Sequence, residues 1–380
     1  ISVFKTTMKN TLLLWVMILV TTLCAHGGQN DFRGTEASPA SNVDEQTQQA
    51  EKDFNPGDFI FDHIGDSHEW HIFTIGHRHI SIPLPIILYS RTHNKLFFFF
   101  SNKLHHGHSS YKGFSLMIEG EYKGKIVEVD ESGKIIEGAQ LPMDFSITKN
   151  VVGIWFSIAL LLLIFIPVAK RYENYPLTAP KGLQSLMETV ILFVRDDIAR
   201  PSIGDRHYNR FMPFLLTVFF FILINNLLGL IPIFPAGANT TGNIAVTMAL
   251  ALCTLILILI SGNKHFWKDI FNPPGIPIFL KLPIPIMPFV EMASWIIKPL
   301  VLMIRLFANI LAGHIIAMVL FGLIFIFGAV NIYFGYGISV VSILLTVFMS
   351  LLEILVAFIQ AFVFTMLSAI FLGMATAEHH

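Results

Sequence analysis

Long apolar segments dominate the second half of the chain. The first covers about residues 150–169 and has no charged residue, and four more follow at about 211–231, 243–261, 289–327 and 338–374. A helix needs about 20 mostly apolar residues to cross the hydrocarbon core of a bilayer. The pattern therefore predicts an all-α membrane domain over 144–380 with about five membrane helices.

The last two apolar segments are longer than a perpendicular membrane helix requires. They are separated by residues 328–337, GAVNIYFGYG, whose glycines and asparagine favour a turn near residue 334. A long apolar segment fits a bilayer by tilting. We therefore expect the chain to end in a long, tilted helical hairpin.

Basic residues give the orientation. Lys170 and Arg171 follow the first segment, and Lys264 and Lys268 follow the third. Since Lys and Arg concentrate in cytoplasmic loops, these ends and the C-terminus are predicted to be cytoplasmic and the N-terminal part extracytoplasmic. The mixed segment 183–199 is expected to lie along the cytoplasmic interface.

The N-terminal part has a different pattern. Residues 1–28 carry Lys9, an apolar run and small residues, as in a secretory signal peptide, although an uncleaved anchor helix is the alternative. Residues 29–56 are polar and are predicted to be a disordered linker. Short alternating runs at 57–143, with a hairpin around Gly133, predict a small β-rich extracytoplasmic module.

This module holds nine of the fifteen histidines, which raises the question of a metal site. The spacing in HEWH (68–71) is too short for a zincin helix and the segment resembles a strand. Surface or packing roles are favoured, so no metal and no cofactor are predicted. The nine are His63, His68, His71, His77, His79, His93, His105, His106 and His108.

Composition supports a membrane protein and excludes other classes. Apolar residues make up 54% of the chain and charged residues 13%, and the net charge of -1 gives no reason to expect nucleic acid. Cys24 and Cys253 cannot form a disulfide framework. No phosphate loop, zincin motif or nucleophile elbow occurs in the sequence, so no soluble type of catalysis is predicted.

Between Pro299 and Ala377, the charged or imidazole side chains are Arg305, His314 and Glu353. A charged side chain near the bilayer centre costs about 2.5 to 3.5 kcal/mol on insertion scales. They are therefore expected to face protein or water and to serve a function. His314 is nine residues from Arg305, which places it on the opposite side of a helix.

Heptad spacing extends this polar pattern. Glu291, Lys298 and Arg305 form one stripe, and Ser339, Thr346, Glu353 and Gln360 form another. An antiparallel hairpin that turns near residue 334 places Arg305 level with Gln360, and His314 level with Glu353.

Titration chemistry separates the roles of these residues. His and Glu can exchange protons, whereas a guanidinium stays charged. Each of these residues also has a purely structural alternative. Arg305 could extend to the membrane interface or form a buried ion pair with Glu353. Gln360 and Asn309 could serve in helix packing, and Glu291 could be solvated.

The motifs RLFANILAGH (305–314) and EILVAFIQAFVFTMLSAIFL (353–372) resemble subunit a of the bacterial F-type ATP synthase membrane sector. Supporting similarity lies in RFMPFLLTVFFFILINNLLGLIP (210–232) and KGLQSLMETVILFV (181–194). His314 and Glu353 exchange the acid and the imidazole of the usual family pattern, and Ala308 replaces a frequent glycine.

The resemblance implies a non-catalytic, proton-translocating stator subunit in the cell inner membrane. Arg305 then faces a ring of c subunits, Asn309, His314, Glu353 and Gln360 belong to an outer half-channel, and Glu291 lies near an inner one. Implied partners are the c-ring proteolipids, peripheral-stalk b subunits, other ATP synthase subunits, lipids and protons.

Two other classes remain as alternatives. A stand-alone ion-coupled secondary transporter usually shows two similar halves with broken helices, and no such repeat is visible in the sequence. An ion channel needs a pore lined by several polar groups. The sequence does not decide between proton and sodium coupling.

Overall fold

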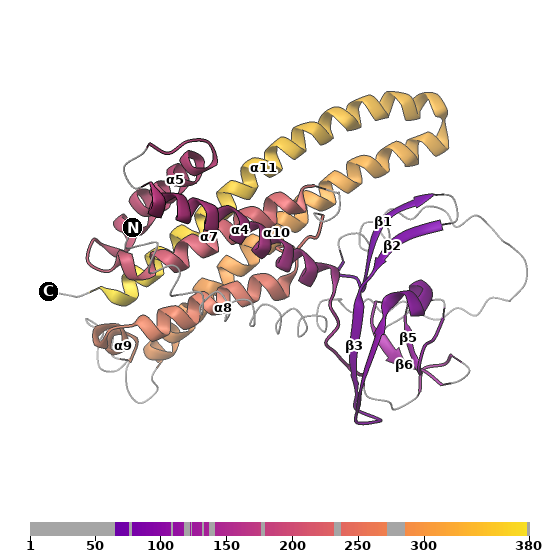
Figure 1. Cartoon of the computed structure of the whole chain (residues 1–380), viewed down its shortest axis with the longest axis horizontal. Helices are drawn as coiled ribbons and strands as arrows, with labels where there is room; N and C mark the ends of the chain where they lie inside the picture. Colours follow the sequence, from indigo (N-terminus) through magenta and orange to yellow (C-terminus); the bar gives the residue numbers. More distant parts are fainter. Residues whose placement is uncertain are drawn as a thin grey trace, which may run out of the picture.

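The computed structural model describes residues 65–377 apart from 76–77, 108, 118–121, 123, 131–132, 137–140, 176–178, 232–236 and 272–285. The predicted signal peptide at 1–28 and linker at 29–56 lie outside these residues. A bundle of long helices occupies one side of the molecule and a group of strands the other (Figure 1).

Among the residues that the structure describes, five helices are long and apolar enough to cross a membrane. They agree with the five predicted segments to within a few residues at most ends, except where the last two meet. They are α4 (Lys149–Asn174), α7 (Tyr208–Gly229), α8 (Ile244–Ser261), α10 (Ile286–Val330) and α11 (Ile332–Thr376).

The turn between α10 and α11 differs from the prediction. Residues 328–337 are almost entirely helical, and Asn331 alone separates the two 45-residue helices. Its side chain caps α11 by accepting a hydrogen bond from the backbone N of Tyr333 at 2.9 Å. Gly335 is a packing residue: a methyl group there would lie 2.8 Å from Cα of Gly328, so the absence of a side chain lets the helices approach closely.

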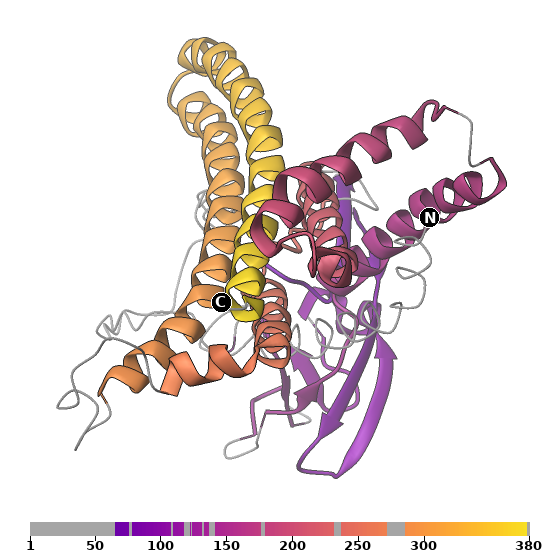
Figure 2. The ribbon, with the colours of Figure 1, turned by 90° about the vertical axis from the view of Figure 1, so that its left-hand side faces the viewer.

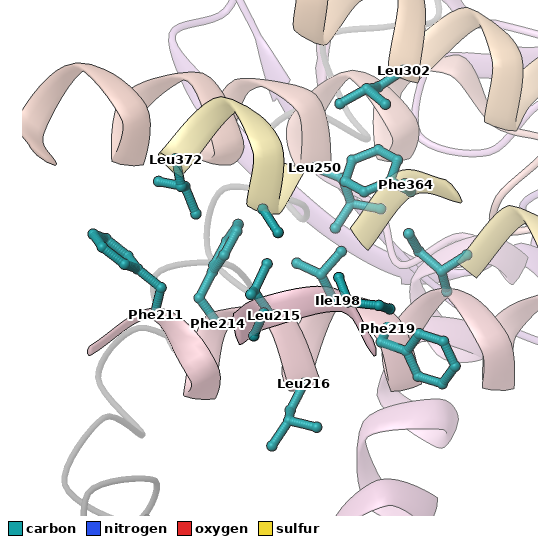
Figure 3. Packing of buried hydrophobic residues seen from close by; sticks show 14 of the residues in the cluster. Ile198, Phe211, Phe214, Leu215, Leu216, Phe219, Leu250, Leu302, Phe364 and Leu372 are labelled. Carbon is teal, nitrogen blue, oxygen red and sulfur yellow. The ribbon is translucent and has the colours of Figure 1, made fainter. Parts of the chain in front are cut away.

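Helix α7 forms the centre of the bundle and is buried over most of its length. Apolar side chains from α7, α8, α10, α11 and the segment around Ile198 pack into one cluster (Figure 3). Because van der Waals contact between closely packed side chains stabilises the association of membrane helices, the hairpin is fixed to the bundle through the half that lies away from Asn331. Residues labelled in the figure include Phe214, Phe219, Leu250, Leu302 and Phe364.

Shorter helices gather at the end of the bundle that lies away from the strands (Figure 1). They are α5 (Leu183–Phe193), the π-helical segment η3 (Val194–Ala199), α6 (Arg200–Ile203) and α9 (Lys264–Phe271). Helix α6 touches α11 so closely that a methyl group at Gly373 would overlap the backbone oxygen of Ser202. The predicted interfacial segment 183–199 is thus helical and continues into a contact with the hairpin.

The strands form three small antiparallel sheets, in the orders β1-β2, β4-β3-β7 and β5-β6. The turn at Gly133 has a positive φ of 77° and joins chain segments that bridge at Val129 and Ile135, as the hairpin prediction requires. The strands are β1 (Glu69–Ile75), β2 (Arg78–Pro83), β3 (Pro85–Ser90), β4 (Lys95–Phe100), β5 (Phe114–Leu116), β6 (Ile126–Glu128) and β7 (Met143–Asp144).

A second apolar core holds this part together. Ile86, Leu88 and Phe99 of β3 and β4 pack against Leu104 of the short helix η2 (Ser101–Gly107) and against Phe114 and Ile126 of β5 and β6. The core lies on one face of the β4-β3-β7 sheet, so the opposite face carries none of these side chains.

The strands are joined to α4 by buried polar contacts. Nε2 of His68 donates a hydrogen bond to Oδ2 of Asp144 at 2.6 Å, and the Asp66 carboxylate accepts one from the backbone N of Asn150 at 3.1 Å. The backbone N of Lys149 donates to the oxygen of Ser67 at 3.0 Å. These bonds place the first turn of α4 directly against the start of the strand region.

Candidate functional site

A small cavity lies between α7, α10 and α11, toward the strand end of the bundle. It combines polar residues from the consecutive helices α10 and α11 with one from α7, which lies far from them in the sequence. The lining residues are Asn226, Leu230, Asn309, Ile310, Gly313, His314, Glu353, Val356 and Ala357.

His314 and Glu353 meet at this cavity, each half-buried. A methyl group at Gly313 would overlap Oε1 of Glu353, so the glycine makes room for the carboxylate. A methyl group at Gly229 of α7 would lie 3.7 Å from Nε2 of His314. The structure thus brings together the acid and the imidazole that the predicted hairpin register placed at one depth.

Asn226 is a cavity residue that the sequence analysis did not single out. It is 2% exposed, its Nδ2 donates to the backbone oxygen of Ala357 at 3.4 Å, and its buried Oδ1 has no hydrogen-bond partner in the described part of the chain. A buried amide oxygen without a partner is costly. The signal was present in the sequence, since Asn225 and Asn226 stand together in an apolar segment.

Arg305 lies on the outside of α10 and is exposed. The same face carries exposed Val301, Ile304, Ala308 and Ala312. Within the described ranges, Arg305 has no hydrogen bond and no ion pair, so the alternative of a private Arg305–Glu353 pair does not describe this structure. An exposed arginine surrounded by apolar and small side chains is suited to receive a partner from outside the chain.

The other predicted site residues are spread along the hairpin. Asn309 is exposed and also lines the cavity, which places it between the arginine face and the His314 side. Gln360 is 5% exposed on α11 but does not line the cavity, and no hydrogen bond joins it to Arg305. Glu291 is half-buried near the start of α10, and Nζ of Lys298 lies 3.7 Å from the Trp295 ring centroid.

The described residues contain no group of three or more His, Cys, Asp or Glu side chains arranged to hold a metal ion. Several of the nine N-terminal histidines, His63 and His77 among them, lie outside these residues. What the cavity offers chemically is one carboxylate, one imidazole and two amides, a set able to accept, hold and release a proton.

Comparison with known families divides the chain as the fold does. Residues 151–373 match the family described as ATP synthase A chain, and residues 59–145 match a domain of unknown function (DUF8433). The boundary between the matches falls between β7 and α4.

Similar curated proteins carry the name ATP synthase subunit a. The protein of Chloroherpeton thalassium is 44% identical over 241 residues, 62% of this chain and 68% of the relative. Those of Chlorobium phaeobacteroides and Myxococcus xanthus are each 41% identical, over 65% and 63% of this chain and 69% and 75% of theirs. With a family match over most of its length and five membrane-length helices, the chain is a multi-pass membrane protein that belongs to the ATP synthase subunit a family.

Proposed function

We propose that this chain is the stator subunit through which protons reach and leave the rotating c-ring of an ATP synthase, coupling proton flow to rotation. The observation that carries the proposal is the division of α10 into two sides. One side presents an exposed arginine, and the other presents an imidazole beside a carboxylate in a cavity. The partners are the c-ring proteolipids, the peripheral-stalk b subunits and the other ATP synthase subunits.

The cavity is the inner end of an outer half-channel. His314 and Glu353 pass the proton, while Asn226 and Asn309 order the water between them, because amides offer both a donor and an acceptor. Gln360 lies deeper and helps to end this path. The position of the cavity toward the strand end of the bundle fits the entry of protons from the extracytoplasmic side.

Arg305 is the fixed charge at the rotor. It attracts an ionised carboxylate of the ring and keeps the two half-channels separate, because a guanidinium does not give up its proton under protein conditions. Glu291 lies toward the opposite end of the hairpin, on the side of the inner half-channel. The chain itself performs no ATP chemistry, which belongs to other subunits.

The orientation follows from the same scheme. The strand region and the turn between α10 and α11 lie toward one end of the molecule, while α5, α9 and the last turns of α11 lie toward the other (Figure 1). Lys170, Arg171, Lys264 and Lys268 fall at the second end. By the positive-inside rule, that end is cytoplasmic and the strand region is extracytoplasmic, across the inner membrane.

The test is Arg305→Ala in the complete complex. ATP-driven proton pumping into inverted membrane vesicles should be abolished, while the complex still assembles. Val301→Ala, one turn earlier on the same exposed face, is the matched control and should pump normally. Coupled pumping retained by Arg305→Ala would contradict the proposal.

A stand-alone ion-coupled transporter is the competing function. It predicts that the purified chain, free of other subunits, moves ions after reconstitution. The stator proposal predicts instead that the chain purifies in a fixed ratio with a small proteolipid and is inactive alone.

A further inference from the structure

One face of the β4-β3-β7 sheet is apolar, exposed and not covered by any described part of the chain. On β4 the side chains alternate: Phe97 and Phe99 turn toward the module core, and Leu96 (65% exposed), Phe98 (53%) and Phe100 (48%) turn outward. Cross-strand pairing places Ile87 beside Phe98 and Tyr89 beside Leu96. We call the outward side chains Ile87, Tyr89, Leu96, Phe98 and Phe100 the apolar sheet face.

Exposed aromatic residues in this number need an explanation. Contiguous exposed apolar patches on a protein surface generally mark contact with a membrane or another protein. Phe98 and Phe100 also touch each other, with ring centroids 5.8 Å apart, so they form one continuous surface.

The sheet is held at the membrane end of α4. The backbone N of Phe145 donates to the oxygen of Ile87 at 2.8 Å, and that of Ile147 donates to the oxygen of Pro85 at 3.1 Å. Helix α4 begins at Lys149 and exposes Trp155, Leu162 and Leu163, as a lipid-facing helix does. Because the connection is short and hydrogen-bonded, the apolar sheet face lies close to the plane where α4 enters the bilayer.

The apolar sheet face is on the membrane side of the module. Figure 1 shows β5 and β6, which cover the opposite face of the sheet, on the side of β3 that lies away from the helices. In the view from the helix side, the long purple strands at the bottom reach beyond the helices, so the bundle does not stand in front of that part of the strand region (Figure 2).

We propose that the apolar sheet face rests on the bilayer and inserts Phe98 and Phe100 into the interfacial zone. Aromatic side chains are enriched at this depth of a membrane. Exposed Arg91, the first residue of the turn between β3 and β4, is placed to meet anionic headgroups. The module thereby widens the footprint of the chain on the lipid surface and braces α4.

The proposal is tested by nitroxide labelling of Phe98→Cys in the complete complex, reconstituted in phosphatidylcholine–phosphatidylglycerol nanodiscs. Cys24 and Cys253 are first replaced by Ala. The collision rate of the label with oxygen, relative to a water-soluble nickel chelate, should be several-fold higher than for a label at Ile135→Cys. Ile135 is apolar and 42% exposed on the same module, but beyond β6.

Phe100→Cys provides a second site and should behave like Phe98→Cys, and co-purification with the other subunits verifies assembly. A collision ratio equal to that at Ile135 would mean that the face is in water. Shielding from both reagents would mean that a protein covers it. Either result overturns the proposal, whether or not Arg305 proves essential for pumping, because the sheet face and the arginine are tested by different measurements.

Discussion

At the scale of single residues, the proposed function needs an acid beside an imidazole at the cavity, whichever helix carries each of them. His314 reaches the cavity from α10 and Glu353 from α11, and Asn226 adds a buried amide from α7. Proton transfer depends on having a group that is protonated beside one that is not. Two like groups at this point would instead disfavour each other's charged form.

Exchanging the two residues should therefore preserve function. We predict that Glu353→His alone and His314→Glu alone each lower proton pumping about 100-fold, the usual scale for losing a positioned proton-transfer group. The double variant His314→Glu/Glu353→His should pump better than either single variant. Fluorescence quenching of a pH-sensitive dye in inverted vesicles measures this, and a double variant no better than the singles would contradict the pairing.

Gly313 has a space-making role that the sequence did not indicate. We predict that Gly313→Ala displaces the Glu353 carboxylate, since overpacking costs about 1 to 3 kcal/mol, and that pumping falls while assembly persists. Gly337→Ala is the matched control, because a methyl group there meets nothing within 4 Å. Equal pumping by the two variants would show that the close approach of the Glu353 carboxylate to Gly313 does not matter for proton transport.

At the scale of elements, the hairpin of α10 and α11 provides most of the residues that line the cavity. Two 45-residue helices meet at one capping residue, and close contact between Gly328 and Gly335 keeps their ends together. The length of the two apolar runs made a long hairpin predictable. The position of the turn was not, because glycine and asparagine serve equally as turn residues, caps and close-packing residues, and only the neighbouring helix distinguishes these uses.

The cap offers a direct test of the turn. Asn331→Ala removes the hydrogen bond to the backbone N of Tyr333, and losing such a cap costs about 0.5 to 2 kcal/mol. We expect a lower midpoint of thermal unfolding for the purified complex in nanodiscs. Ser339→Ala, whose hydroxyl bonds only within its own helix at 2.8 Å, should change the midpoint less. A larger effect of Ser339→Ala would argue against a turn at Asn331.

At the scale of the whole molecule, a buried ionic cluster connects the strand region to α4. Burial by itself lowers the pKa of His68, but the hydrogen bond to Asp144 and the nearby carboxylates of Asp66 and Glu69 outweigh it and raise that pKa above its ordinary 6.5. Burial likewise opposes ionisation of Asp144, yet the bond from His68 brings its pKa below 3.8.

These two pKa shifts make the stability of the junction between the strand region and α4 depend on pH. The raised pKa of His68 gives stability that is complete below pH 6.5 and is lost as pH rises through the folded value. The lowered pKa of Asp144 gives stability that is complete above pH 3.8 and is lost as pH falls through its folded value. Burial keeps the pKa of neighbouring Asp66 above 3.8, and this opposes part of the stability that His68 and Asp144 contribute.

We predict that the junction resists protease best between about pH 4 and 6.5, measured as cleavage between the strand region and α4 in the intact complex. His68→Ala should increase cleavage and flatten its pH dependence on the alkaline side. His93→Ala, at an exposed turn of the same module, is the control and should leave the profile unchanged. An unchanged profile in His68→Ala would mean that the cluster does not hold the junction.

The sequence by itself determined the number and approximate extent of the membrane helices and the presence of Arg305, His314 and Glu353 within them. Both follow from local quantities, namely apolar length and the cost of a charge in lipid. Tertiary structure alone decided the turn at Asn331, the space that Gly313 leaves for Glu353 and the place of Asn226 in the cavity. These depend on which side chains of neighbouring helices touch, and, unlike the hairpin register that placed His314 level with Glu353, such contacts leave no period or spacing in the sequence.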